Sequence, residues 1–262
     1  ETGDPTLMET LLRLWHDMTT TKLYVTGGIG ARYEGESFGN PYELPNARAY
    51  AETCAAVGLI FWAWRMLLIT GESQYADILE LALYNGALAG IGLDGTSYFY
   101  VNPLADDGTH RRQPWFECAC CPPNIARLLA SLPGYCYRIS PGTIWVNLYI
   151  SNEANLTLPD GLTIRLQQST DYPWGEGVEF TLKTEGEYTL ACRIPQWCTT
   201  GAAIQVNGMH VDDAEPGKYA KIRRQWRVGD RLTLSFPMPP RRLIAHPFVS
   251  EDHGCTAITR GP

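Results

Sequence analysis

Apolar residues recur at spacings of three and four along the first half of the chain, and this spacing places them on one face of a helix. The pattern predicts four helices, over residues 5–18, 49–70, 73–91 and 122–132. Asp4 and Pro5 stand where the first helix would begin, and Gly71 follows directly after the second. These are residue types that start and stop helices, so local signals agree with the periodicity.

From about residue 139 the pattern changes to alternation with a period of two, which is typical of strands with one buried face. Turn residues, mainly Gly, Asp, Asn and Pro, separate the alternating segments. We expect seven strands: 143–151, 162–170, 178–185, 188–195, 202–208, 219–226 and 230–236. Many short strands with regular turns favour an antiparallel β-sandwich.

The change of period divides the chain into a helical domain over residues 1–138 and a β domain over residues 139–262. The chain begins without an initiator Met, and an alternating pattern has just started in its last residues. We therefore expect an internal fragment, with a partial helical domain and a β domain truncated at its carboxyl end.

Composition narrows the possible partners. The chain has 262 residues, of which 45% are hydrophobic and 19% charged, and its net charge is −7 without a cluster of Lys and Arg. This charge argues against binding to nucleic acid or to an anionic membrane surface. The longest apolar runs, such as residues 55–64, are shorter than the roughly 20 residues of a membrane span. A small neutral substrate fits better.

Three of the eight cysteines lie within four positions, at Cys118, Cys120 and Cys121. Pro122 follows at once and a helix is predicted from there, so these thiols lie at a helix amino terminus. The positive end of the helix dipole favours a thiolate, which is the form required for metal binding and for nucleophilic attack.

Two further donors, Glu52 and Cys54, stand near the start of the predicted helix 49–70. In a regular helix they would lie roughly 200° apart around the axis, so both can face one ion only if the helix starts irregularly or the ion sits at its end. Three cysteines and one glutamate could form a tetrahedral zinc site. Buried thiols without a function are the alternative.

Four ordered segments resemble glycoside hydrolase family 127, the bacterial β-L-arabinofuranosidases: KLYVTGGIGARYEGESFG, AYAETCA, FYVNPL and WFECACCPPNIARLLASL. The resemblance extends along the whole chain, which would represent the middle of a family member. It implies an (α/α)6 barrel, of which this chain would hold the carboxyl-terminal half, followed by β-sandwich domains. It also implies a retaining enzyme that releases β-L-arabinofuranose from arabinose-containing glycans.

Matching these segments position by position implies a role for individual residues. Cys120 would be the nucleophile that attacks the anomeric carbon, and Glu36 would be the general acid and base. Tyr100 would line the sugar pocket. Trp115, just before the cysteines, is the tryptophan best placed to touch a ligand. The resemblance gives four ligands to a zinc ion: Glu52, Cys54, Cys120 and Cys121.

Two other functions remain open from the sequence. The zinc could simply stabilise the helical domain of a non-catalytic carbohydrate-binding or interaction protein, because a closed shell of three Cys and one Glu is typical of structural sites. A related glycosidase could act on another sugar. An acyl-transferring cysteine hydrolase is disfavoured, since no His suggests a base. Free thiols favour a cytoplasmic location, and the family resemblance is compatible with a homodimer.

Overall fold

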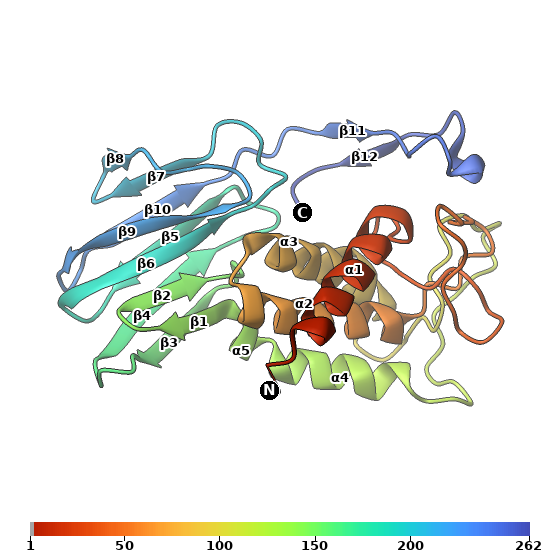
Figure 1. Ribbon diagram of the computed structural model, residues 1–262, viewed down its shortest axis with the longest axis horizontal. Coiled ribbons are helices and arrows are strands. Elements are labelled where there is room, and N and C mark those ends of the chain that lie inside the picture. Colours follow the sequence, from red (N-terminus) through yellow and green to blue (C-terminus); the bar gives the residue numbers. More distant parts are fainter. Residues whose placement is uncertain (1–2) are drawn as a thin grey trace. The chain divides into compact units, whose positions relative to one another are not determined.

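The α-helices all lie before residue 137, in the part of the chain where the spacing of apolar residues predicts helices (Figure 1). The computed structural model describes residues 3–262. The first helix begins after Asp4, whose side chain accepts a hydrogen bond from the Thr6 amide at 2.9 Å, which is an N-cap interaction. Within the described residues the α-helices are α1 Pro5–Thr21, α2 Thr53–Thr70, α3 Ser73–Leu81, α4 Cys121–Ser131 and α5 Pro133–Cys136.

The second helix starts later than the sequence pattern predicts. The prediction of helix from residue 49 is wrong for four positions, because α2 begins only at Thr53. Just before it, Ala51 has a φ of +39°, a left-handed value that a helix cannot contain. Ala51 and Glu52 therefore precede the helix and lie outside it. The other end agrees with the sequence, since Gly71 follows Thr70 with a φ of +75°.

The third predicted helix is distorted over its second half. After α3 the chain continues as a π-helix, η1 Ala82–Ala87, and a 3₁₀ turn, η2 Leu88–Gly90. Gly27 packs against this π-helix so closely that a Cβ on it would lie 2.8 Å from the Ala82 backbone nitrogen. The π-helix widens where it meets a glycine that is far away in the sequence. Local periodicity cannot predict such a contact.

Strands follow from residue 137 and form two larger sheets. The four-stranded sheet has the order β1-β2-β6-β9, and the six-stranded sheet has the order β3-β4-β5-β10-β7-β8. The pair β11 Arg241–Leu243 and β12 Ala257–Thr259 forms a separate small sheet. The remaining strands are β1 Tyr137–Ser140, β2 Thr143–Val146, β3 Asn152–Thr157, β4 Thr163–Thr170, β5 Gly177–Leu182, β6 Gly186–Ile194, β7 Ala203–Val206, β8 Met209–Val211, β9 Lys218–Trp226 and β10 Arg231–Ser235.

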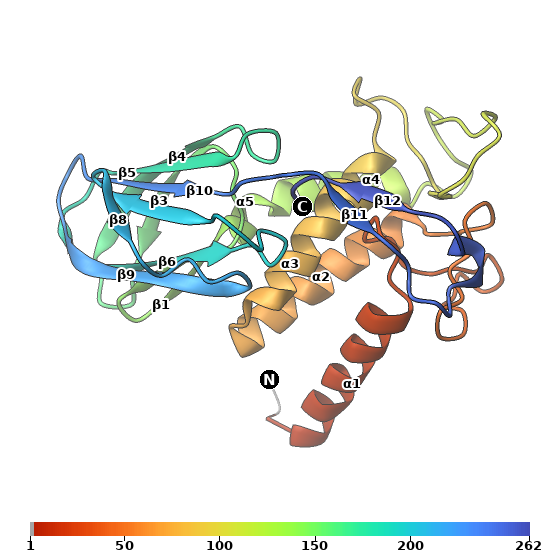
Figure 2. The ribbon, with the colours of Figure 1, turned by 90° about the horizontal axis from the view of Figure 1, so that it is seen from above.

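The six-stranded sheet is antiparallel throughout. One pair departs from the antiparallel pattern that the sequence predicts, because β2 runs parallel to β6 with Ile144 opposite Leu190. Figure 2 shows the two larger sheets as layers, one above the other. Alternate residues of the strands are buried, for example Val178, Phe180 and Leu182 on β5, so the apolar alternation identifies the inner faces.

The chain divides into two compact units that interleave along the sequence. One contains the residues up to Phe61, Leu81–Leu128 and Arg242–Ile258, and the other contains Trp62–Glu80, Leu129–Arg241 and Thr259–Pro262. The mixed organisation of helices followed by sheets is confirmed. The complete barrel, the sandwich and the domain boundary at residue 138 stay predictions.

Helix α2 is longer and more apolar than the runs from which the sequence analysis excluded a membrane span. Its 18 residues have a mean hydropathy of 1.6, which by length and composition alone would suffice to cross a membrane. Of this segment 44% is buried within the structure, including Val57, Ile60 and Leu67, which are fully buried. The core helix of a folded protein passes the same test, so the observation is weak support for a span.

Candidate active site

Four side chains from two segments far apart in the sequence converge in the first compact unit. One ligand atom each from Glu52, Cys54, Cys120 and Cys121 lies within 4.8 Å of every other. The Cys121 sulfur is 3.5 Å from that of Cys54 and 3.7 Å from that of Cys120. The Glu52 Oε1 atom lies 3.3 Å from the Cys120 sulfur and 3.7 Å from the Cys121 sulfur.

These separations match the edges of a tetrahedron around a small cation. With metal–sulfur bonds of about 2.3 Å and metal–oxygen bonds of about 2.1 Å, a tetrahedral zinc ion sets sulfur–sulfur distances near roughly 3.8 Å and sulfur–oxygen distances near roughly 3.6 Å. Glu52 and Cys121 are buried, whereas Cys54 and Cys120 are partly accessible. The donor set therefore fits a zinc-sized ion in both chemistry and spacing.

Residues around Thr53 give Glu52 and Cys54 their common direction. The Thr53 amide donates to the Tyr100 carbonyl at 2.9 Å, and its hydroxyl donates to the Phe99 carbonyl at 2.9 Å. Asn102 donates through its side-chain amide to the Ala51 carbonyl, also at 2.9 Å. Because α2 begins at Thr53, Glu52 is not on the helix. The separation of roughly 200° that a regular helix would impose therefore does not apply, and Glu52 and Cys54 can face one ion.

Cys120 and Cys121 lie at the amino terminus of α4, as the sequence predicts. Cys121 is the first residue of the helix, and the Asn124 amide donates to the Cys120 carbonyl at 3.2 Å. The two sulfurs thus face the same cluster from adjacent positions, one before the helix and one inside it. The positive end of the helix dipole favours negative charge here.

The surroundings of the three thiols shift their pKa values. Burial raises the pKa of Cys120 to about 12, although a hydrogen bond with Tyr100 opposes this. The hydrogen bond between Cys54 and Cys121 raises the pKa of Cys121 and lowers that of Cys54. A thiolate at Cys120 near neutral pH therefore requires positive charge beyond what the protein side chains provide, and a divalent cation in the cluster would supply it.

A pair of tyrosines joins this cluster to Glu36. The Cys120 thiol lies 3.3 Å from the Tyr100 hydroxyl, and the Tyr100 ring packs beside the Tyr50 ring, with centroids 6.2 Å apart. The Tyr50 hydroxyl donates to Glu36 Oε1 at 2.8 Å. Glu36 sits at a φ of +48° in a turn in which its amide donates to the Tyr33 carbonyl at 3.1 Å. The arrangement thus connects the carboxylate to the sulfur cluster.

The structure brings together most of the residues singled out in the sequence. Tyr100 contacts the four-residue cluster directly, and Glu36 is linked to Tyr100 through Tyr50. Trp115 is 61% exposed, and its contact with a ligand stays a prediction. Sequence reasoning missed Tyr50, although it lies in the segment AYAETCA, two positions before Glu52. Its place in a segment that carries the family resemblance was the signal that could have identified it.

Comparisons with known proteins agree with this geometry. Residues 1–134 match the sequence model of the β-L-arabinofuranosidase GH127 catalytic domain, and residues 143–238 match that of the GH127 middle domain. The chain belongs to the GH127 family. The family resemblance inferred from the four sequence segments is therefore confirmed.

Individual GH127 relatives are similar along nearly the whole chain. A non-reducing end β-L-arabinofuranosidase of Bifidobacterium longum subsp. longum is 38% identical over 99% of this chain and 42% of its own length. A solved GH127 β-arabinofuranosidase superimposes with a TM-score of 0.96 at 41% identity, covering 99% of this chain and 44% of its own. A GH127 β-L-arabinofuranosidase of Geobacillus stearothermophilus T6 gives a TM-score of 0.92 at 43% identity, covering 99% and 43%. The chain thus spans less than half the length of these relatives.

Proposed function

We propose that this chain carries the catalytic centre of a retaining glycoside hydrolase that releases β-L-arabinofuranose from arabinose-containing glycans. The observation that carries the proposal is the closeness of a carboxylate, Glu36, to a cluster of three thiols and Glu52. Glu36 is hydrogen-bonded to Tyr50, whose ring packs beside that of Tyr100, and the Tyr100 hydroxyl lies 3.3 Å from the Cys120 sulfur. Retaining glycosidases need a nucleophile and a proton donor in one site. The relatives named as β-L-arabinofuranosidases support the choice of sugar.

Glu52, Cys54, Cys120 and Cys121 would hold a zinc ion. When bound, zinc supplies the positive charge that keeps the surrounding thiols deprotonated at neutral pH. Cys120 is the partly accessible member of the adjacent pair, whereas Cys121 is fully buried. Cys120 is therefore the sulfur of that pair to which a sugar carbon has access.

The reaction would proceed in two displacements. The Cys120 thiolate attacks the anomeric carbon, the bond from that carbon to the glycosidic oxygen breaks, and Glu36 gives its proton to the departing oxygen. Glu36, now ionised, then accepts a proton from water while the water oxygen attacks the anomeric carbon. The bond to the Cys120 sulfur breaks, which releases the sugar and restores the thiolate. Tyr50 holds the Glu36 carboxylate in place through both steps.

The test compares hydrolysis of p-nitrophenyl β-L-arabinofuranoside by wild type, Cys120→Ser and Glu36→Gln in the protein at its full natural length, with zinc measured in each. We expect both variants to lose at least ~10²-fold in kcat, with zinc retained in Glu36→Gln. Zinc without cleavage of the arabinofuranoside would contradict the proposed substrate and favour a structural site or another sugar.

A further inference from the structure

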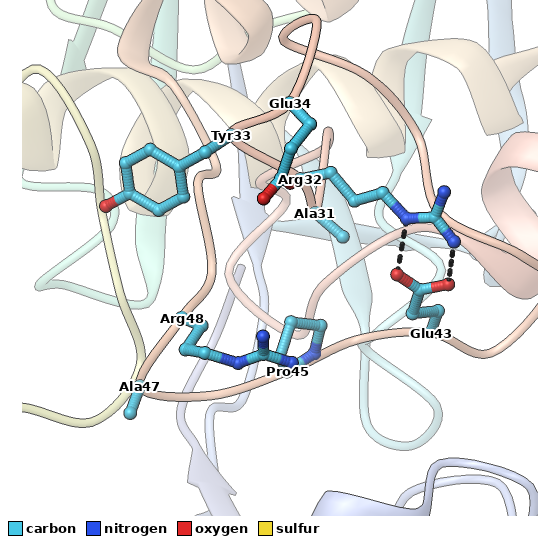
Figure 3. Close-up of a pocket in the computed structure, with 8 residues that line it drawn as sticks. All are labelled: Ala31, Arg32, Tyr33, Glu34, Glu43, Pro45, Ala47 and Arg48. Atoms are coloured by element: carbon cyan, nitrogen blue, oxygen red, sulfur yellow. Dashed lines mark hydrogen bonds and ion pairs between the residues drawn. The ribbon is translucent and has the colours of Figure 1, made fainter.

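A cavity lies directly beside the turn that carries Glu36. Its volume is about 480 Å³. Figure 3 shows its lining: Ala31, Arg32, Tyr33, Glu34, Glu43, Pro45, Ala47 and Arg48. We infer that this cavity receives the sugar ring that departs from the scissile bond, an inference that rests on the proposed hydrolysis.

One wall of the cavity and the proposed proton donor belong to the same small hairpin. Arg32 and Ser37 pair through two backbone hydrogen bonds of 3.1 and 3.2 Å. Between them, Tyr33 and Glu34 line the cavity while Glu36 reaches Tyr50. The Tyr33 ring also packs edge-on against the Tyr50 ring, with centroids 4.7 Å apart. A general acid protonates the departing oxygen, so the departing group must lie on its side of the site.

The opposite wall is connected through the backbone to the sulfur cluster. It is formed by residues 43–48, which lead within a few positions to Glu52. The Tyr50 amide donates to the Ala31 carbonyl at 3.2 Å, and the Ala51 amide donates to the Gly30 carbonyl at 2.7 Å. Both walls are therefore fixed to the backbone that presents Glu36 and Glu52.

The charges of the lining suit a neutral ligand rich in hydroxyl groups. Two arginines and two glutamates balance formally. Arg32 binds Glu43 through two hydrogen bonds of 2.6 and 2.5 Å, and this lowers the pKa of Glu43 to about 2, so the pair is ionised at neutral pH. Arg48 and Glu34 are exposed and offer one donor group and one acceptor group.

The cavity also has an apolar platform. The Tyr33 side chain is 52% exposed, and in Figure 3 it lies to one side of the cavity, with the Arg48 guanidinium and Pro45 below. An exposed aromatic ring flanked by a few polar groups is typical of a site that binds the apolar face of a sugar. An anionic ligand would meet as many carboxylates as guanidinium groups.

The test uses two substrates that share the cleaved sugar and differ in the departing group. The first is a β-linked disaccharide of L-arabinofuranose, and the second is methyl β-L-arabinofuranoside, whose methanol is too small to contact the cavity. The readout is the ratio of kcat/KM for the disaccharide to that for the methyl glycoside. Because Tyr33 touches Tyr50, a disturbed Glu36 would affect both substrates and cancel in the ratio.

We expect this ratio to fall about tenfold in Tyr33→Ala and in Arg48→Ala, which corresponds to the loss of one stacking or charge-assisted contact. The matched control is Trp174→Ala, which removes an aromatic side chain that is 83% exposed in the other compact unit, and it should keep the wild-type ratio. If the ratio stays unchanged in both cavity variants while both substrates are cleaved, the cavity assignment is wrong and the proposed function is intact.

A binding measurement separates the two proposals if cleavage is absent. In Cys120→Ser, nuclear magnetic resonance saturation transfer to the reducing-end ring of the disaccharide reports its contact with the protein. Transfer that disappears on Tyr33→Ala, without hydrolysis by wild type, would support the cavity site and contradict the proposed function. Neither transfer nor hydrolysis would contradict both.

Discussion

Among single residues, Tyr50 offers a test of how Glu36 is positioned that changes one hydroxyl group only. Its hydroxyl donates to Glu36 at 2.8 Å, and its side chain is 7% exposed. Tyr50→Phe removes this one hydrogen bond and keeps the ring. We expect kcat for an arabinofuranoside to fall about tenfold because Glu36 loses its orientation. Metal content should match wild type.

Tyr24→Phe is the matched control for this prediction. The Tyr24 hydroxyl donates to the Pro45 carbonyl at 3.1 Å, so the same atom is removed from a buried ring without contact to Glu36. It should lower stability by about 1 kcal/mol and leave kcat near the wild-type value. Equal losses of kcat in the two variants would show that Tyr50 acts only through general stability.

At this scale the sequence predicts the types of residue in the site better than their geometry. Glu52 and Cys54 could be chosen because their side chains are plausible metal ligands, but helical periodicity places them on different faces. The left-handed Ala51 and the hydrogen bonds from Thr53 and Asn102 correct this. Those contacts join segments about fifty positions apart, so no local pattern contains them.

At the scale of elements, the π-helix η1 depends on a close approach between two segments. Gly27→Ala would place a Cβ 2.8 Å from the Ala82 backbone, at a position whose φ is +75°. We expect it to lower the free energy of unfolding by at least about 2 kcal/mol, from left-handed strain and overpacking together. Urea denaturation measures this change.

Gly95→Ala separates the two causes. Gly95 has a φ of +71°, but nothing lies within 4 Å of a Cβ built on it. This variant should show only the conformational cost of about 1 kcal/mol. If Gly27→Ala and Gly95→Ala lowered the free energy of unfolding equally, close packing of Gly27 against Ala82 would not contribute to stability.

The elements that the sequence predicts well are those with one strongly apolar face. Strands β5 and β10 bury every second residue, and the alternation located both. Strand β3 Asn152–Thr157 has no buried residue and β8 Met209–Val211 is largely exposed, so neither has a strongly apolar face and the sequence pattern predicts neither. The parallel pairing of β2 with β6 is a long-range property that alternation does not encode.

An ion cluster connects a helix to a sheet inside the second compact unit. Arg193 on β6 is fully buried and contacts Asp77 at 2.6 Å and Glu80 at 2.5 Å, both on α3. Burial raises the pKa of both carboxyl groups, while Arg193 opposes this. Removing the arginine alone would leave two buried carboxylates without their cation.

We expect Arg193→Met to lower the free energy of unfolding by about 3–5 kcal/mol near pH 7. The defect should shrink as the pH falls, because carboxyl groups whose folded pKa is raised bind protons more tightly in the folded state. Thermal unfolding between pH 5 and 8 measures this dependence. Combining Arg193→Met with Asp77→Asn and Glu80→Gln should recover most of the loss, and a pH-independent defect would exclude the carboxylates as its cause.

For the whole molecule, the order of segments along the chain differs from their grouping in space. The family matches divide the sequence near residues 134–143, close to the change of periodicity. The compact unit that contains both larger sheets nevertheless includes Trp62–Glu80, a helical segment from before that boundary. Sequence periodicity identifies the type of each element, whereas the grouping depends on contacts such as Arg193 with α3.

This grouping predicts that one substitution has opposite effects in the intact chain and in a fragment. A fragment of residues 139–262 lacks α3, so the Arg193 guanidinium would lie on the sheet without its partners Asp77 and Glu80. Arg193→Met should therefore raise the urea midpoint of the fragment, although it lowers that of the intact chain. A lower midpoint in both would mean that the arginine stabilises the sheets through its contacts there, such as the 2.8 Å hydrogen bond to the Asn147 carbonyl. The pairing with α3 would then not be what ties residues 62–80 to the second unit.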